Sequence, residues 1–160
     1  MTDNQRILDA IRRLVQLLRL SDRAAQSRLG LSSAQVFVLA ELGKEDALSL
    51  KDLAERTRTD QSSVSVVVGR LVAAGYVTRA RAEDDARRLV LKLTRSGRAA
   101  LQRVPPVAQE RLIEALETLP ASARRQFADT FAKLLEAMGA EKGKPPMLFE
   151  DHSVKRKKSK

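Results

Sequence analysis

The sequence predicts a mainly α-helical protein that carries one small two-stranded β-hairpin. Over most of the chain, apolar residues recur at the three- and four-residue spacing of amphipathic helices. Between residues 76 and 93, two short runs read as extended, and the second of them alternates with period two. The 160 residues suffice for one domain with at most an added arm, and the absence of Cys excludes disulfides.

Two helices are predicted first, at about residues 5–29 and 32–42. The apolar positions of the first helix are Ile7, Ile11, Leu14 and Leu18. Gly30 is suited to end it, because glycine readily adopts the left-handed conformation that follows many helices. Ser32, followed three residues later by Gln35, forms a capping box that starts the second helix.

A short helix is predicted from Ser49 to about Thr57, and another over about residues 60–74. The latter contains the run VSVVV, whose β-branched residues also suit a strand. The spacing i, i+3, i+4, i+7 of its apolar residues decides for a helix. These residues are Val64, Val67, Val68 and Leu71. Gly75 then follows as a stop.

The extended runs at residues 76–81 and 87–93 flank the polar stretch ARAEDDA, which predicts a hairpin with an exposed tip. Another helix begins at Thr94. Pro105 and Pro106 must break or kink it, because proline has no backbone N–H to donate.

Helix resumes to about Leu116, and the last helix begins at Pro120, a position where the missing N–H costs nothing. Its apolar residues are Phe127, Phe131, Leu134, Leu135 and Met138. Gly139 ends it.

A short helix, a tight turn, a second helix and a two-stranded wing together form a winged helix-turn-helix over about residues 32–94. The outer helices, at about residues 5–29 and 106–139, are too apolar to stand alone and are predicted to form a second, helical lobe. We expect both lobes to belong to a single domain over residues 1–140.

The composition changes at Glu141. Residues 141–160 hold seven Lys or Arg against three Asp or Glu, with Gly and Pro early and a basic run late. This predicts a basic, disordered tail. The run from Lys155 to Lys158 has two readings that the sequence leaves open, a solvated tail or an arm that follows DNA phosphates.

Composition also narrows the function. The formal net charge of +10 favours a polyanionic partner, above all nucleic acid. With no Cys and a single His, His152, the chain cannot build a Cys-ligated zinc site or a multi-histidine site, and it shows no nucleophile–base pair and no Gly-rich phosphate loop. We therefore expect no enzyme, no cofactor and no metal. Without a long apolar run or a signal peptide, we expect a cytoplasmic protein with no membrane partner.

The outward side of the helix at residues 60–74 is small and weakly polar. A solvated face without a partner usually carries Lys and Glu, so this bare face favours contact with the major groove of double-stranded DNA. There Ser donates or accepts, Val66 touches a thymine methyl group and Arg70 reaches a guanine or a phosphate. The candidate major-groove residues are Thr59, Gln61, Ser62, Ser63, Ser65, Val66 and Arg70.

The hairpin tip supplies a second candidate contact. An arginine at such a tip suits a narrow minor groove, whose negative potential attracts guanidinium. Asp85 precedes Arg87 by two residues and is expected to hold it by a charge-assisted hydrogen bond, although an ordinary surface ion pair is the plainer reading. The candidate wing residues are Arg81, Asp85, Arg87 and Arg88.

The stretch from Asp85 to Thr94, closed by Gly97, resembles the wing signature D-x-R-x-x-x-L-x-L-T-x-x-G of the multiple antibiotic resistance regulator (MarR) family. Residues 61–77 are similar to the recognition helix of that family and its exit, and residues 31–42 to the helix before it. The resemblance covers about residues 5–139.

The resemblance implies a homodimer in which the N-terminal helix and the last two helices of both chains interlock, so that about residues 5–29 and 106–139 form a helical dimerisation lobe. It also implies that Ser62, Ser63 and Ser65 enter the major groove of a pseudo-palindromic operator, and that Arg87 enters the minor groove. Family members usually repress transcription, and many release DNA when a small aromatic or lipophilic ligand binds between the lobes. Val66 departs from the family, which often has a basic residue near this position. The absence of Cys and the single His argue against oxidant or zinc sensing.

We therefore expect a sequence-specific, DNA-binding transcriptional regulator, a homodimeric repressor released by a small molecule. The bare helix face and the basic tail leave one alternative, an architectural protein that coats DNA without sequence preference. A scaffold whose winged helix binds protein is a third reading, and the net charge weighs against it.

Overall fold

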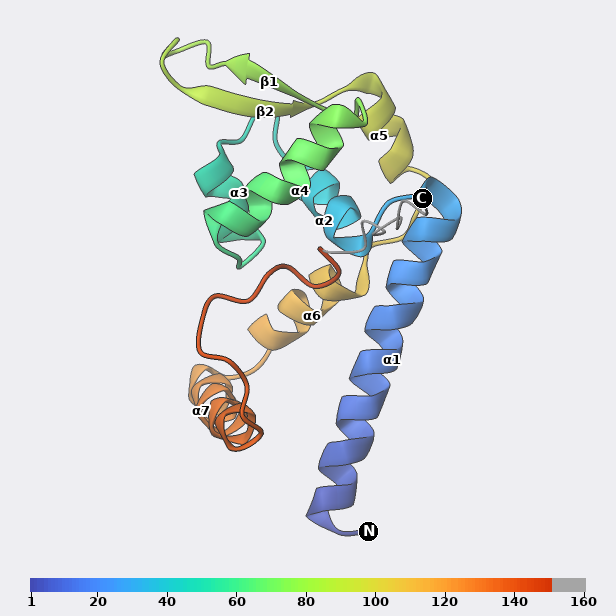
Figure 1. Cartoon of the computed structure of the whole chain (residues 1–160), viewed down its shortest axis with the longest axis vertical. Helices are drawn as coiled ribbons and strands as arrows, with labels where there is room; N and C mark the ends of the chain where they lie inside the picture. Colours follow the sequence, from blue (N-terminus) through green and yellow to red (C-terminus); the bar gives the residue numbers. More distant parts are fainter. Residues whose placement is uncertain (151–160) are drawn as a thin grey trace, which may run out of the picture.

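The computed structural model describes residues 1–150 (Figure 1). Within this range it confirms a mainly α-helical fold with a two-stranded wing, and every element predicted from the sequence is present. The elements are α1 (Asp3–Leu29), α2 (Ser33–Gly43), α3 (Leu50–Arg56), α4 (Gln61–Ala73), β1 (Val77–Arg81), β2 (Leu89–Leu93), α5 (Arg95–Leu101), α6 (Ala108–Glu117) and α7 (Ala121–Ala137).

The helix starts follow the local signals in the sequence. Ser32 and Ser49 cap α2 and α3, and each forms a reciprocal capping box with the residue three positions later. These boxes satisfy amide N–H groups that the first helical turn leaves without a partner. Asp22 of α1 accepts a hydrogen bond from the Ser33 backbone N at 2.7 Å, which joins α1 to the start of α2.

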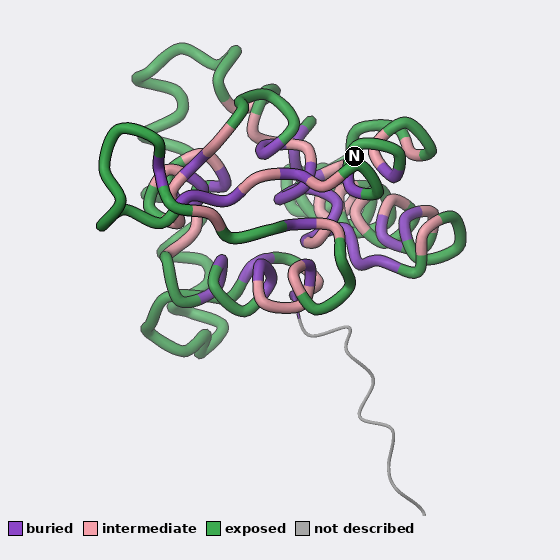
Figure 2. Tube along the Cα trace, turned by 90° about the horizontal axis from the view of Figure 1, so that it is seen from above, coloured by how far each residue is buried: buried purple, intermediate pink, exposed green. Residues whose placement is uncertain are grey.

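The core lies where α2, α3 and α4 meet the base of the wing. Phe37, Leu39 and Leu42 of α2 are fully buried, together with Leu53 of α3 and Leu71 of α4. Figure 2 shows the buried residues gathered in the middle of the molecule. The valines of the ambiguous VSVVV run confirm the helical reading, because Val64, Val67 and Val68 are all buried on one side of α4.

The wing is an antiparallel pair in which Val77 lies opposite Leu93 and Arg81 opposite Leu89. Its base is joined to the core, since Leu48 and Leu91 exchange two backbone hydrogen bonds. Its tip, residues 82–88, projects away from the helices (Figure 1).

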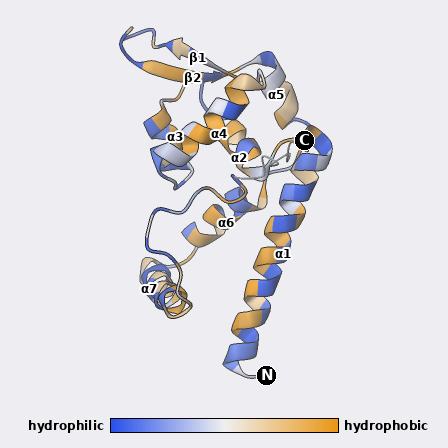
Figure 3. Cartoon of the chain, viewed as in Figure 1, coloured by the Kyte–Doolittle hydropathy of each residue, from blue (hydrophilic) through white to orange (hydrophobic). Residues whose placement is uncertain are grey.

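The outer helices expose apolar side chains. α1 extends away from the core, and none of the residues of α7 is buried (Figure 1). Apolar residues are distributed along the whole length of α1 (Figure 3). The exposed large apolar residues of these two helices are Ile7, Leu8, Val15, Leu17, Leu20, Phe127, Phe131, Leu134 and Leu135. Among residues 1–150, no helix combines the length and the apolar character needed to cross a membrane.

The structure differs from the sequence-based prediction at the start of the tail. Met147 is only 3% exposed and belongs to the hydrophobic core cluster, so the segment around it is packed rather than disordered. The charge and Pro content of residues 141–160 do not predict this packing, because it depends on contacts with segments far away in the sequence. His152 and the run from Lys155 to Lys158 lie outside the described residues.

Candidate nucleic-acid interface

The helix α4 presents a bare face to solvent. Gln61, Ser62 and Ser65 are exposed, and Val66 is 44% exposed. A Cβ atom added at Gly69 would find no other atom within 4 Å, so this face is also unobstructed. No charged side chain interrupts the surface formed by these five positions, and its size suits the major groove, about 12 Å wide.

Two of the candidate major-groove residues lie at the edge of this face. Ser63 is 8% exposed, and Arg70 is only partly exposed. They are seven positions apart, which is nearly two helical turns, so they lie on the same flank of α4. The structure therefore does not bring Ser63 to the open surface with Ser62 and Ser65. The spacing of residues in the sequence predicted that Ser63 lies near that surface, but it could not show that other residues cover this side of α4.

The N-terminus of α4 is held by Asp60. Its carboxylate accepts hydrogen bonds from the Ser62 hydroxyl at 2.5 Å and from the Ser63 backbone N at 3.0 Å. These two bonds hold the pKa of Asp60 below its usual range. Thr59 precedes the helix, and its hydroxyl donates to the Thr57 carbonyl at 3.0 Å, so this candidate lies in the turn before α4.

At the wing tip, Asp85 holds the main chain rather than a guanidinium. Its carboxylate accepts a hydrogen bond from the Arg87 backbone N at 2.9 Å. Within residues 1–150, the Arg87 guanidinium does not bond to Asp85. The prediction therefore named the right pair of residues but the wrong donor, since the backbone N of Arg87 donates instead. Arg81 adds a second brace, because its guanidinium donates to the Ala86 carbonyl at 2.7 Å. Both bonds fix the shape of the tip.

The other tip arginines differ in their pairing. Arg88 donates to both carboxylate oxygens of Asp84, at 2.8 and 2.9 Å. This pairing lowers the pKa of Asp84 and raises the pKa of Arg88. Within residues 1–150, the guanidinium of Arg87 forms no ion pair, and the residue is exposed. Arg87 is thus available to an external anion, whereas Arg88 is already neutralised by its neighbour.

A charged cluster that sequence patterns do not predict joins α2 to α6. Lys44, at the end of α2, lies 2.7 Å from Glu41 and 3.0 Å from Glu110 of α6. Partial burial by itself lowers the pKa of Lys44, but hydrogen bonds to the two carboxylates outweigh it and raise the pKa. Arg58 adds an ion pair with Glu117 at 2.8 Å. Glu41 is three positions from Lys44, but Glu110 and Glu117 are far from their partners in the sequence, so no local pattern predicts these two pairs.

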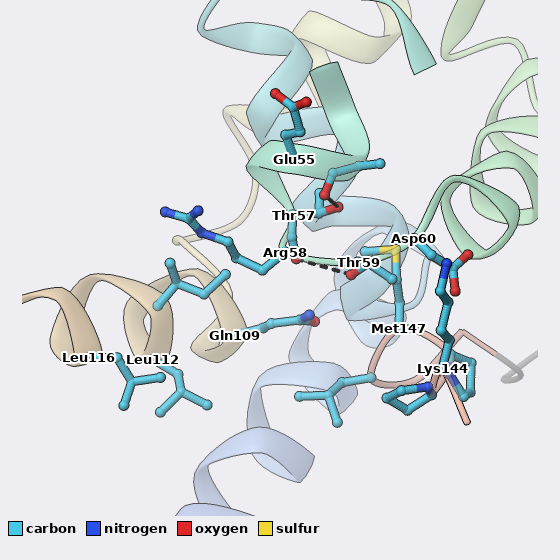
Figure 4. Close-up of a pocket in the computed structure, with 15 residues that line it drawn as sticks. Glu55, Thr57, Arg58, Thr59, Asp60, Gln109, Leu112, Leu116, Lys144 and Met147 are labelled. Carbon is cyan, nitrogen blue, oxygen red and sulfur yellow. Dashed lines mark hydrogen bonds between the residues drawn. The ribbon is translucent and has the colours of Figure 1, made fainter. Parts of the chain in front are cut away.

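A cavity of about 650 Å³ lies between the turn before α4, the helix α6 and the C-terminal segment (Figure 4). Leu112, Ile113 and Leu116 line it from α6, and Met147 lines it from the C-terminal segment. Gln109 also lines it, and its buried Oε1 atom has no hydrogen-bond partner within the described residues. An apolar wall with one unused acceptor suits a small molecule that carries a hydrogen-bond donor. Among residues 1–150, no group of three His, Asp or Glu side chains is placed to hold a metal ion.

Comparison with known proteins shows similarity to transcriptional regulators. A family model described as "MarR family" matches residues 29–88, which hold most of the winged helix-turn-helix. The HTH-type transcriptional repressor MdtR of Bacillus subtilis (strain 168) is 30% identical over 137 residues, which cover 86% of each chain.

Solved structures share the fold. The structure of Bordetella bronchiseptica BpsR, described as showing regulation of DNA binding by 6-hydroxynicotinic acid, matches with a TM-score of 0.53 and 26% identity over 88% of this chain and 98% of that one. A mutant MarR from E. coli in complex with operator DNA matches with a TM-score of 0.53 and 23% identity, over 84% and 99% of the two chains. At that identity, the second match bears on the fold alone.

Proposed function

This chain belongs to the MarR family of transcriptional regulators, and from that premise we propose that it is a homodimeric repressor that binds a specific sequence in double-stranded DNA. The observation that carries the proposal is the bare face of α4 beside a wing tip whose Arg87 guanidinium has no ion-pair partner within residues 1–150. The exposed residues of α4 contact base edges in the major groove, and Arg87 contacts the adjacent minor groove. An enzymatic role has no support in the relatives, which are transcriptional regulators.

The proposed dimer rests on α1 and α7. Phe127 is 54% exposed, and its ring stacks on Phe131 with the centroids 5.6 Å apart. A contiguous exposed apolar stripe of this kind marks a surface that another chain covers. The same stripe on a second copy supplies a self-complementary partner, and a twofold dimer presents two recognition helices to a pseudo-palindromic site.

A charge placed in this stripe should dissociate the dimer. We expect Phe131→Glu to be monomeric at concentrations where the parent chain is dimeric, because the carboxylate would be buried without a partner at the interface. Lys133→Glu is the matched control, since Lys133 is exposed and lies about 200° around the helix from Phe131. Sedimentation equilibrium measures both masses. A dimeric Phe131→Glu chain would show that α7 is not the interface.

The cavity beside α6 is the proposed site for a small aromatic or lipophilic ligand that releases the DNA. Gln109 Oε1 accepts a hydrogen bond from the ligand, and the leucines and isoleucine of α6 contact its apolar part. The cavity walls come from both lobes, so occupancy can change how α6 is placed relative to α4. The printed description of BpsR, in which a small aromatic acid regulates DNA binding, supports this mode.

The proposed function is tested by fluorescence anisotropy with the DNA upstream of the protein's own gene and a scrambled fragment of equal length. We expect the protein to bind the upstream fragment at least about a thousandfold more tightly than the scrambled fragment at physiological salt. We also expect the logarithm of its binding constant to fall by about 0.9 per phosphate neutralised for each unit of log salt concentration. Equal affinity for both fragments would instead support an architectural protein.

A further inference from the structure

Arg70 is occupied by the chain's own C-terminal segment. Its Nη1 atom donates a hydrogen bond to the backbone carbonyl of Glu150. Arg70 is the one cationic residue among the candidate major-groove contacts, so this bond engages the side chain best suited to DNA phosphate or guanine. The two residues are 80 positions apart in the sequence.

The segment that reaches Arg70 is anchored at two points. Met147 is 3% exposed and packs within the core cluster, and Glu150 is 8% exposed. A closed turn joins them, because the Glu150 backbone N donates to the Met147 carbonyl at 3.0 Å and the Met147 backbone N donates to Glu150 Oε2 at 2.9 Å. In Figure 1 the segment rises from α7, and residues 144–148 line the cavity together with α6 and the turn before α4.

The segment also carries a feature that opposes docking. Phe149 has a backbone φ of 64°, in the left-handed region that side chains other than Gly rarely adopt. Such a conformation costs free energy and persists only where the surrounding contacts impose it. The burial of Met147 and the bond to Arg70 are two of the contacts that oppose this cost, and the loss of either one favours release.

We propose that residues 145–150 form an intramolecular clamp on α4 that holds Arg70 out of the DNA groove and opens when DNA binds. The inference rests on the proposed function, because it takes α4 as the DNA-reading helix. A phosphate oxygen is a stronger acceptor for guanidinium than the neutral Glu150 carbonyl, so DNA can take Arg70 from the clamp. The Arg70 guanidinium becomes available to DNA only in the open state.

The clamp weakens the apparent affinity for DNA, because the apparent dissociation constant equals that of the open state divided by the fraction of open molecules. If it is open in about one molecule in five to ten, the apparent dissociation constant is about five- to tenfold above that of the open state. Binding and release of the segment thus set the affinity of the protein without any change in the contacts to DNA.

The clamp is tested with two matched substitutions in the full chain. Met147→Ser removes the buried anchor, whereas Leu148→Ser alters the next residue, whose side chain is 41% exposed. We expect Met147→Ser to bind upstream DNA about five- to tenfold more tightly than the parent, and Leu148→Ser to bind as the parent does. The gain should disappear when Met147→Ser is combined with Arg70→Ala, because the clamp acts through Arg70.

A second measurement uses the unmutated protein. The chain has three Met residues, of which Met1 and Met138 are 88% and 73% exposed. The methyl NMR signal of Met147, assigned from its absence in the volume-conserving variant Met147→Leu, should move towards those exposed signals when saturating DNA is added. A Met147 signal that stays in place in the DNA complex would overturn the clamp even if Met147→Ser failed to fold.

The outcomes separate this inference from the proposed function. If parent and variants bind DNA with equal affinity, DNA binding stands and the clamp alone is wrong. A Met147→Ser chain that binds more weakly, with unchanged helicity and dimer mass, overturns the clamp as well. If none of the chains binds any DNA fragment, the proposed function itself is wrong.

Discussion

Replacing Arg87 by Ala in the full chain should weaken binding to the upstream DNA by about a hundredfold. A guanidinium contact in a groove contributes roughly 1–2 kcal/mol, and a dimer loses two of them, one from each wing. Within residues 1–150 the side chain forms no ion pair, so its removal leaves no partner unsatisfied in the protein. Fluorescence anisotropy at matched salt measures the loss, and circular dichroism and sedimentation should show unchanged helicity and dimer mass.

The neighbouring arginine provides the control for this prediction. Arg88→Ala removes the same charge from the same tip, but Arg88 is held by both oxygens of Asp84. We expect the substitution to weaken DNA binding by at most about tenfold, because a guanidinium already paired with a carboxylate gains little from a DNA phosphate. Equal losses of affinity for the two variants would mean that the wing contributes only positive charge. An Arg87→Ala chain with parental affinity would remove the minor-groove role.

Replacing Gly97 by Ala should lower the free energy of unfolding by about 3 kcal/mol. A Cβ atom at this position would overlap the Tyr76 carbonyl oxygen and would lie 3.2 Å from Leu93 Cδ2. The carbonyl cannot easily move away, because it accepts a hydrogen bond from the Thr94 backbone N at 3.0 Å. Relief of the overlap must therefore separate α5 from the base of the wing. Thermal unfolding at fixed protein concentration should show a midpoint lowered by about 6–12 °C.

Gly69→Ala is the matched control for the predicted loss of stability in Gly97→Ala. Gly69 is helical, and an added Cβ would meet no other atom within 4 Å. Since alanine favours a helix over glycine by about 1 kcal/mol, the midpoint of unfolding should rise slightly. If Gly97→Ala were as stable as the parent, the close packing of α5 on the Tyr76 carbonyl would not contribute to the fold.

Sequence patterns predicted the helix ends well because these ends depend on near neighbours. Ser32 and Ser49 start helices through bonds to residues three positions away, and Gly30 ends α1 with a φ of 68°. Spacing alone also predicted the helix at residues 60–74. Apolar residues that recur with a 3.6-residue period lie on one side of a helix, which can then be buried. The bare face of α4 followed from the same geometry.

Charge pairing at the wing tip could not be predicted from spacing. Asp84 and Asp85 both precede the two arginines, and either could pair with either. The structure gives the Arg88 guanidinium to Asp84 and the Arg87 backbone N to Asp85, which leaves the Arg87 guanidinium unpaired within residues 1–150. The direction of each side chain depends on the path of the turn, and several turns suit this composition.

The element order, the helix starts and stops, the wing and the apolar stripes of α1 and α7 can all be predicted from local sequence, because these features depend on residues within a few positions of one another. Three other features emerge only when the chain folds: Ser63 is covered, Lys44 at the end of α2 pairs with Glu110 of α6, and Met147 is part of the core. Each of these contacts joins segments far apart in the chain. Their partners are chosen by packing in three dimensions, which no local period or spacing records.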